Sequence, residues 1–131
     1  MAWTVTESVQ MNRRARDGIK KKSIKLECTS DGSGTSHAIE SGGLRGLFLY
    51  GVKYIPSGAP DAPGTAPTIT ITDALGATLF NEAPTAAATA QWLGGDLTIG
   101  QMPLVDDALT IALTTLDDTK KADFIFQFVE R

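Results

Sequence analysis

The sequence predicts an all-β fold, a single antiparallel β-sandwich of about eight strands, of either the jelly-roll or the immunoglobulin-like type. Three observations support this prediction. The chain has 131 residues, which is enough for one hydrophobic core and too few for two ordinary domains. Apolar and polar residues alternate in many short segments, as they do when one face of a strand is buried. Thirteen Gly and six Pro in a chain that is 42% apolar indicate turns between strands rather than disorder.

The N-terminal part contains two alternating segments joined by a basic stretch. Residues 3 to 10 alternate apolar and polar side chains, with Glu7 as the one charged residue on the apolar face. Residues 24 to 29 alternate in the same way and predict a second strand. Between the two segments, Asp17-Gly18 is a dipeptide that favours a tight turn. We therefore expect a basic β-hairpin over residues 11 to 22.

The middle of the chain alternates between strands and turn-rich loops. Residues 29 to 36 predict a polar loop, because Gly permits a positive φ and Asp and Ser side chains cap backbone groups. Residues 44 to 55 are apolar on both alternating sets, which is typical of a central strand. Residues 56 to 67 contain four Pro, which lack an amide donor, and predict a Pro/Gly-rich surface loop. Residues 68 to 80 predict a β-hairpin with its turn at residues 73 to 76.

The C-terminal part contains one ambiguous segment and two clear strands. Residues 85 to 93 are rich in Ala and favour a short helix or an irregular connection. Residues 109 to 114 and residues 124 to 128 both alternate between large apolar and other side chains. We expect these two segments to form antiparallel strands joined by an exposed turn at residues 117 to 121.

Residue types that often build functional sites are scarce. The chain has one cysteine, Cys28, and one histidine, His37, which excludes an intrachain disulfide and a zinc site of several Cys and His ligands. We expect Cys28 to be a small buried hydrophobe. No nucleophile motif accompanies His37, so we expect it to be an ordinary loop residue and the chain to have no catalytic residue. Trp3 and Trp92 could serve a core or an interface, and core burial is the simpler expectation.

Two further motifs suggest ligands but lack the necessary context. Gly32-Ser33-Gly34 begins like a dinucleotide-binding glycine motif, but His stands at position 37 and no helix is expected to follow. Asp31, Asp106-Asp107 and Asp117-Asp118 lack the spacing of a calcium-binding loop. We expect these residues to belong to solvated turns, and the protein to use no cofactor and no metal.

Charge is concentrated at the N-terminal end. Residues 1 to 30 hold seven basic and three acidic residues, and residues 31 to 131 hold five basic and twelve acidic ones, so their net charges are +4 and −7. We expect the basic hairpin to dock on an acidic partner or on the acidic body of a neighbouring copy. The candidate interface residues are Arg13, Arg14, Arg16, Lys20, Lys21 and Lys22.

Two other interpretations of the basic hairpin remain open. As a nucleic-acid contact, its bases would neutralise phosphates, but the segment has no aromatic residue that could stack on bases, and the acidic remainder would repel a polyanion. As a solvated turn, the hairpin would bind nothing. Nucleic acid is therefore an unlikely partner on the sequence alone.

The order of strands and loops between Ile24 and Phe80 resembles small structural proteins of tailed bacteriophage virions. The resemblance rests on an alternating strand followed by Thr-Ser-Asp-Gly-Ser-Gly at residues 29–34, then on residues 46–56 and residues 66–77. These segments carry strands and turns rather than catalytic groups, so the resemblance transfers no site residue. It implies a β-sandwich component of the particle, above all a capsid decoration (cement) protein that binds between capsid subunits. The basic hairpin departs from that pattern.

Together these observations predict a non-enzymatic virion structural protein, made in the cytoplasm of a bacterial host. Its expected partners are the major capsid protein or other virion proteins and further copies of itself, as a dimer or trimer. The alternatives are a tail, baseplate or fibre component that contacts neighbours or host-surface glycans, and a small nucleic-acid-binding module. We expect no membrane contact, because the chain has no run of about 18 apolar residues and its N-terminus lacks the pattern of a secretory signal.

Overall fold

The computed structural model describes residues 3–14, 18, 20–40, 42–94, 103–105, 108–114 and 119–130, and of residues 11–14 it describes the backbone. Within these residues the chain forms strands and no helix, which confirms the all-β prediction. The strands are β1 (Thr4–Arg14), β2 (Lys20–Thr29), β3 (Thr35–Ala38), β4 (Phe48–Pro56), β5 (Ile69–Asp73), β6 (Thr78–Glu82), β7 (Gln91–Leu93), β8 (Leu109–Leu113) and β9 (Lys121–Val129).

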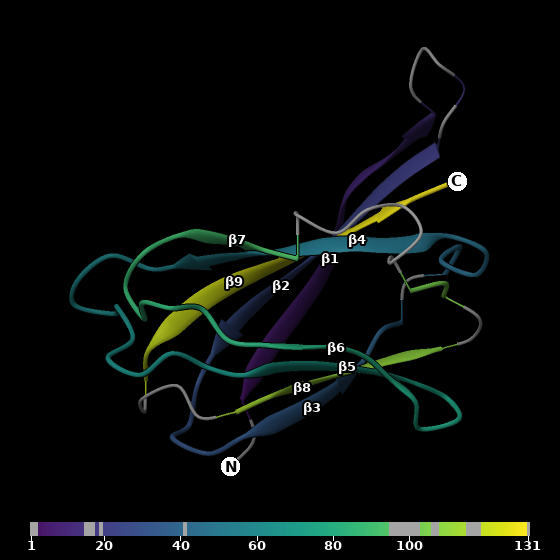
Figure 1. Cartoon of the computed structure of the whole chain (residues 1–131). Coiled ribbons are helices and arrows are strands. Elements are labelled where there is room, and N and C mark those ends of the chain that lie inside the picture. The colour runs from purple at the N-terminus through teal and green to yellow at the C-terminus, as the bar shows by residue number, and fades with distance from the viewer. Residues whose placement is uncertain are drawn as a thin grey trace.

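The strands form two antiparallel sheets that pack face to face (Figure 1). One sheet has five strands in the order β1-β2-β9-β4-β7, and the other has four strands in the order β3-β8-β5-β6. Every pair of neighbouring strands is antiparallel. The predicted antiparallel β-sandwich is therefore confirmed.

The strand pairs are nested along the chain. β5 pairs with β6, β4 with β7, β3 with β8, and β2 with β9. Successive nested pairs alternate between the four-stranded and the five-stranded sheet. The chain from β2 to β9 is thus one long double ribbon that folds back at the β5–β6 turn and winds around the core.

The core lies between the inner faces of the two sheets. Alternation along each strand sends every second side chain inward, so the buried residues come from nearly all strands. Large aromatic side chains fill the middle, and the rings of Tyr54 and Phe124 have their centroids 5.6 Å apart. The largest fully buried side chains are Tyr54, Phe124, Phe126, Phe128, Ile24, Leu26, Leu49, Ile69, Ile71, Leu109, Ile111 and Leu113.

Two expectations about loops and pairing are wrong. His37 lies on strand β3, not in a loop, since Thr35–Ala38 pairs with β8. β8 and β9 lie in different sheets, so the connection between them crosses from one sheet to the other instead of closing a hairpin. Residues 115–118 of that connection lie outside the described residues. Alternation located both C-terminal strands correctly, but it carries no information about their partners.

The Ala-rich segment forms no helix, so the irregular alternative is the right one. Its last residues form β7, in which Leu93 points into the core and Trp92 points outward. Trp92 is 37% exposed, so its expected core burial is wrong, whereas that of Trp3, at 6% exposed, is confirmed. A tryptophan beside a leucine on a strand cannot share its face, and here the leucine takes the inward position.

The β5–β6 hairpin is present as predicted. Its turn is held by Asp73, whose Oδ1 accepts hydrogen bonds from the amides of Leu75 and Ala77 at 3.0 and 2.9 Å. Gly76 has a φ of +86°, which a residue with a side chain rarely adopts. The side chain of Leu75 is 91% exposed at the tip of this turn.

Candidate docking surface

The predicted basic hairpin is a continuation of the five-stranded sheet. Met11–Arg14 of β1 pair with Lys20–Ser23 of β2, and Gly18 in the connection has a φ of 83°. β1 and β2 extend beyond the rest of the sandwich, beside the end of β9 (Figure 1). The register of β1 shifts between Val9 and Met11, which marks a β-bulge. A bulge bends its strand and increases the twist, and beyond it Lys21–Ser23 of β2 still pair with β9.

The root of the hairpin is attached to the body. The amide of Glu130 donates to the carbonyl of Lys20 over 2.8 Å, which extends the pairing of β2 with β9. The Nζ atom of Lys22 donates to the carbonyl of Gly42, in the connection between β3 and β4. The hairpin is therefore held in a defined direction and is not a loose arm at its base.

Of the six candidate interface residues, the three lysines are described, and they do not lie together on one exposed surface. Lys21 is exposed, Lys20 is half-buried, and Lys22 is only 5% exposed. The side chains of Arg13 and Arg14 and the whole of Arg16 lie outside the described residues.

Lys22 differs from the expectation because it lies on the inner face of β2. It shares that face with Ile24, Leu26 and Cys28, two, four and six residues further along the strand. Extending the alternation backward from Ile24 would have predicted its inward position. Lys22 thus helps to hold the hairpin on the body and does not offer its charge to a partner.

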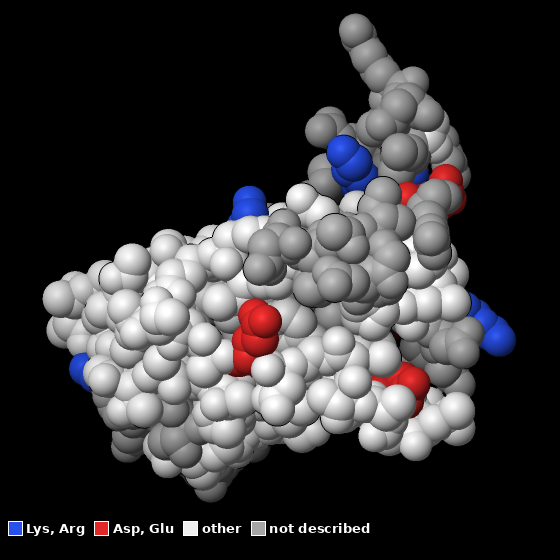
Figure 2. All heavy atoms as spheres, viewed as in Figure 1, with Lys and Arg blue, Asp and Glu red and all other residues white. Residues whose placement is uncertain are grey.

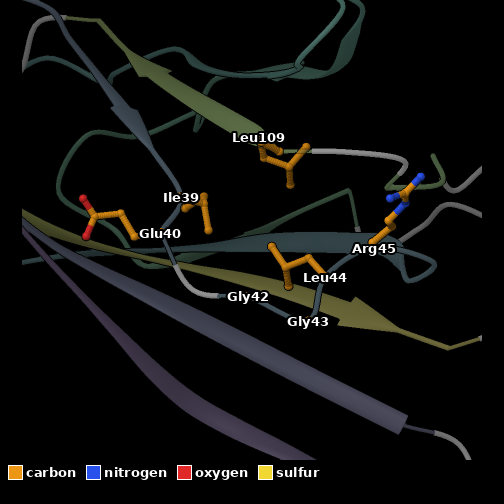
Figure 3. A pocket seen from close by; sticks show the side chains of 8 residues that line it. Ile39, Glu40, Gly42, Gly43, Leu44, Arg45 and Leu109 are labelled. Carbon is orange, nitrogen blue, oxygen red and sulfur yellow. The ribbon is translucent and has the colours of Figure 1, made fainter.

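A hollow of about 240 Å³ lies beside the carbonyl that Lys22 contacts (Figure 3). The side chains of Ile39, Leu44 and Leu109 point toward one another in it, while Glu40 and Arg45 lie on opposite sides and point outward. Among its described lining residues the interior is apolar, and these residues bring no pair of titratable groups together for acid–base chemistry.

His37 is engaged in a contact between the two sheets. Its Nε2 atom lies 2.9 Å from Oε1 of Glu7, and the same carboxylate oxygen accepts the amide of Glu40 at 3.0 Å. Both side chains are largely buried, with exposed fractions of 20% for His37 and 10% for Glu7. This contact joins β1 at the edge of one sheet to β3 at the edge of the other. It also explains why a carboxylate interrupts the apolar face of β1.

Cys28 is an inert thiol. Its side chain is 3% exposed, and burial, with a smaller effect of Asp123, raises its pKa to about 12. The thiolate form that would attack an electrophile or bind a metal is therefore suppressed at neutral pH. The expectation that Cys28 is a buried hydrophobe is confirmed.

On the outer face of the body, Lys25 is paired with two carboxylates. Nζ of Lys25 lies 3.4 Å from Oε1 of Glu27 and 3.6 Å from Oδ2 of Asp123, and the charge of Asp123, followed by the hydrogen bond of Glu27, raises the pKa of Lys25. In Figure 2 the projecting end carries basic atoms beside acidic ones, while most of the visible face of the body carries neither. Single charged side chains of both signs also lie on the body in this view.

Neither a metal centre nor a membrane helix is found in the part of the chain that the structure describes. No three His, Cys, Asp or Glu side chains there are grouped so as to hold a metal ion. No helix in that part is long and apolar enough to cross a bilayer.

The structure also pairs Trp92 with Tyr50, a half-buried residue that the sequence did not connect with it. Tyr50 on β4 and Trp92 on β7 lie with their ring centroids 5.3 Å apart, and Nζ of Lys53 lies 5.8 Å from the centroid of the Trp92 ring. Trp92 and Lys53 face each other across the β4–β7 pair, about forty positions apart in the chain. No local pattern in the sequence joins residues at that separation.

No protein-family model matches this chain, and no curated protein sequence is significantly similar to it. Its function is therefore inferred from the surfaces described above.

Proposed function

We propose that this chain is a non-enzymatic structural protein of a virion, a capsid decoration (cement) protein that attaches to the particle through its basic hairpin. The observation that carries the proposal is the direction of the β1–β2 hairpin, which continues beyond a bulge in β1 and is held at its root by Lys22 and Glu130. The proposed partners are the major capsid protein or other virion proteins, and further copies of the chain.

We also propose that the sandwich is a jelly roll and not an immunoglobulin-like domain. The nested pairs β2–β9, β3–β8, β4–β7 and β5–β6, alternating between sheets, are what a rolled double ribbon produces. In an immunoglobulin sandwich the second strand lies between the first and the fifth. Here β2 lies between β1 and β9. Jelly rolls are common among viral capsid and lectin domains, which agrees with a structural or binding role.

A hairpin fixed at its root is well suited to docking. Because its backbone is already ordered by β9 and by the 42–43 connection, binding loses less conformational entropy than the ordering of a free arm would. Clustered positive charge would orient the hairpin toward an acidic surface and speed its encounter with that surface. A standard protein interface buries about 800 Å² on each partner, so the adjoining face of the body would also take part.

The first test is the number of copies of the protein in purified particles, measured by quantitative mass spectrometry against the major capsid protein. A copy number comparable with that of the capsid protein is the expected result for decoration. A number near that of tail or baseplate subunits would favour the tail, baseplate or fibre alternative. Absence from the particle would overturn the virion proposal.

The second test reverses the charge of the three arginines of the hairpin. The test variant carries R13E, R14E and R16E, and the control variant carries the same reversals on the body, R45E, K120E and K121E. We expect occupancy on the particle to fall at least about tenfold in the test variant and to stay unchanged in the control. Unchanged occupancy in the test variant would reject the hairpin as the docking element. Salt-dependent DNA binding that the same variant abolishes would instead favour the nucleic-acid alternative.

A further inference from the structure

The outer face of the five-stranded sheet carries an exposed aromatic surface at β4 and β7. Trp92 stands directly opposite Lys53 in the register of these strands, and it is 37% exposed. Ile55, on the same face of β4, is 39% exposed and lines the same hollow as Trp92, so the two side chains form an exposed apolar patch rather than a single exposed residue.

Gly51 gives the indole its position. A Cβ atom at residue 51 would lie 2.8 Å from Cζ2 of Trp92 and 2.6 Å from the carbonyl oxygen of Leu93. Only a residue without a side chain therefore lets the ring pack directly on the β4 backbone. One side of the indole is covered by Gly51, Nζ of Lys53 lies over the ring, and the side chain stays 37% exposed.

Tyr50 enlarges this surface. The β4–β9 register shifts between Leu49 and Gly51, so Tyr50 is the extra residue of a β-bulge and is turned out of the regular alternation. Its ring is tilted by 45° to that of Trp92. We call Tyr50, Lys53 and Trp92 the aromatic platform.

Hollows with polar rims lie on both sides of the aromatic platform. One, of about 240 Å³, adjoins Tyr50 and is lined by the polar side chains of Lys21, Ser23 and Gln127. The other, of about 270 Å³, adjoins Trp92 and Lys53 and is otherwise mostly apolar. Among the residues that the structure describes, no carboxylate lines either hollow. The platform is thus an apolar surface edged by an amide and two ammonium groups, while Ser23 is buried at the bottom of the hollow at 4% exposed.

We propose that the aromatic platform binds an extended oligosaccharide of β-1,4-linked hexopyranose units. The hydroxyls of such a sugar are mostly equatorial, so its ring has apolar C–H faces that pack against an aromatic ring and a polar edge that needs hydrogen-bond partners. The platform offers both, with Trp92 and Tyr50 for the faces and Lys53, Lys21 and Gln127 for the hydroxyls. A shallow surface on a sheet suits a flat, extended chain better than a compact ligand. This site is separate from the docking role of the arginines and does not depend on it.

The two tryptophans allow a direct test by NMR of their indole N–H groups. Trp3 is buried, and its Nε1 atom donates to the carbonyl of Ser33, so its signal is an internal control. We expect cellohexaose to shift the Trp92 signal in a saturable manner and to leave that of Trp3 unchanged. Cellohexaose carries no charge, so the basic hairpin cannot attract it electrostatically. Maltohexaose, whose α-linked chain is curved, is expected to bind at least several-fold more weakly.

Variants test whether the sugar binds to the aromatic platform or to another part of the surface. Trp92→Phe assigns the signal and keeps a ring, whereas Trp92→Ala and Tyr50→Ala are each expected to weaken binding about tenfold, as calorimetry would show. Leu75→Ala, which truncates an exposed apolar side chain on the β5–β6 turn, is the matched control and should bind like the parent. Circular dichroism establishes that each variant is folded.

Three results would overturn the proposal. One is the absence of any shift at millimolar cellohexaose, and another is equal binding by Trp92→Ala. The third is a Trp92 signal that depends on protein concentration without sugar, since this would mean that a second copy of the chain covers the platform. Because R13E, R14E and R16E should leave sugar binding unchanged, failure of the hairpin proposal and failure of this one are distinguishable.

Discussion

The two halves of the β1–β2 pair differ in what covers them. In the body, the inner face of this pair lies over the other sheet and buries Trp3, Ile24 and Leu26. In the projecting half the strands extend beyond the rest of the sandwich, and the sequence carries a cluster of arginines and lysines there (Figure 1). Stability comes from the covered half, because burial of apolar area is the main favourable term in folding. Because stability does not depend on the projecting half, the side chains there can be charged.

Lys22 marks the boundary between the two halves. It is the last inward position before Ile24, and it meets the carbonyl of Gly42 instead of apolar side chains. A long side chain with a terminal donor can span such a boundary, because its methylene groups pack while its ammonium finds an acceptor. The comparison therefore predicts that substitutions in the covered half lower the free energy of unfolding much more than substitutions in the projecting half.

The largest expected effect is that of a cavity in the body. Phe126→Ala empties a fully buried position on β9 and is expected to lower the free energy of unfolding by about 3–5 kcal/mol. Urea unfolding followed by circular dichroism measures this loss. Ile125→Ala, the next residue on the outer face of the same strand, is the control and should cost clearly less. Equal losses would contradict the assignment of the core to this face.

A smaller effect is expected where the outer face is tightly packed. Gly51→Ala places a methyl group 2.6 Å from the carbonyl oxygen of Leu93, so the backbone has to shift, at an expected cost of about 1–3 kcal/mol. Gly58→Ala is the control, because nothing lies within 4 Å of its new methyl group. If both variants unfold at the same urea concentration, Trp92 does not pack on Gly51 as described.

Alkaline pH should weaken the body through two buried groups. Burial raises the pKa of Cys28 from 9.0 to about 12 and that of Tyr54 from 10.0 to about 12. The unfolded chain loses these protons first, so the free energy of unfolding is intact below pH 9 and falls as the pH rises toward 12. We expect a loss of about 2 kcal/mol between pH 8 and pH 10.5 in urea unfolding.

A variant identifies the thiol as the main source of this pH dependence. Cys28→Val removes the group whose pKa is displaced most, and it should flatten the alkaline decline. Tyr54→Phe is a less simple comparison, since the hydroxyl of Tyr54 also donates to the carbonyl of Ala87. An unchanged decline in Cys28→Val would mean that the thiol is accessible to solvent.

The smallest effect on stability is expected in the projecting half. The triple variant R13E, R14E and R16E should change the free energy of unfolding by less than about 0.5 kcal/mol per site, as surface substitutions usually do. The same urea experiment measures it against the parent chain. A loss as large as that of Phe126→Ala would show that the hairpin is part of the cooperative core, and the contrast between the two halves would then be wrong.

Whether the sequence could predict a contact depends on how far apart the two contacting residues lie in the chain. The β5–β6 hairpin and the β1–β2 hairpin were predictable, because their partners are adjacent in the chain and their turns contain Gly76 and Gly18. Strand β3 was missed because it has only four residues, and three of them are polar, so no apolar alternation is visible. The aromatic platform was missed because Trp92 and Tyr50 meet only after β7 has paired with β4.

The sequence by itself determined the all-β class, the position of most strands, the buried thiol and the basic hairpin, because periodicity, turn residues and charge are properties of neighbouring residues. Only the tertiary structure decided that β8 and β9 belong to different sheets, that Lys22 faces inward, and that His37 meets Glu7 across the sandwich. These features depend on which strands pair and which faces are covered. Strand pairing and the covering of sheet faces are set by burial of the core as a whole, and no local segment of the chain specifies them.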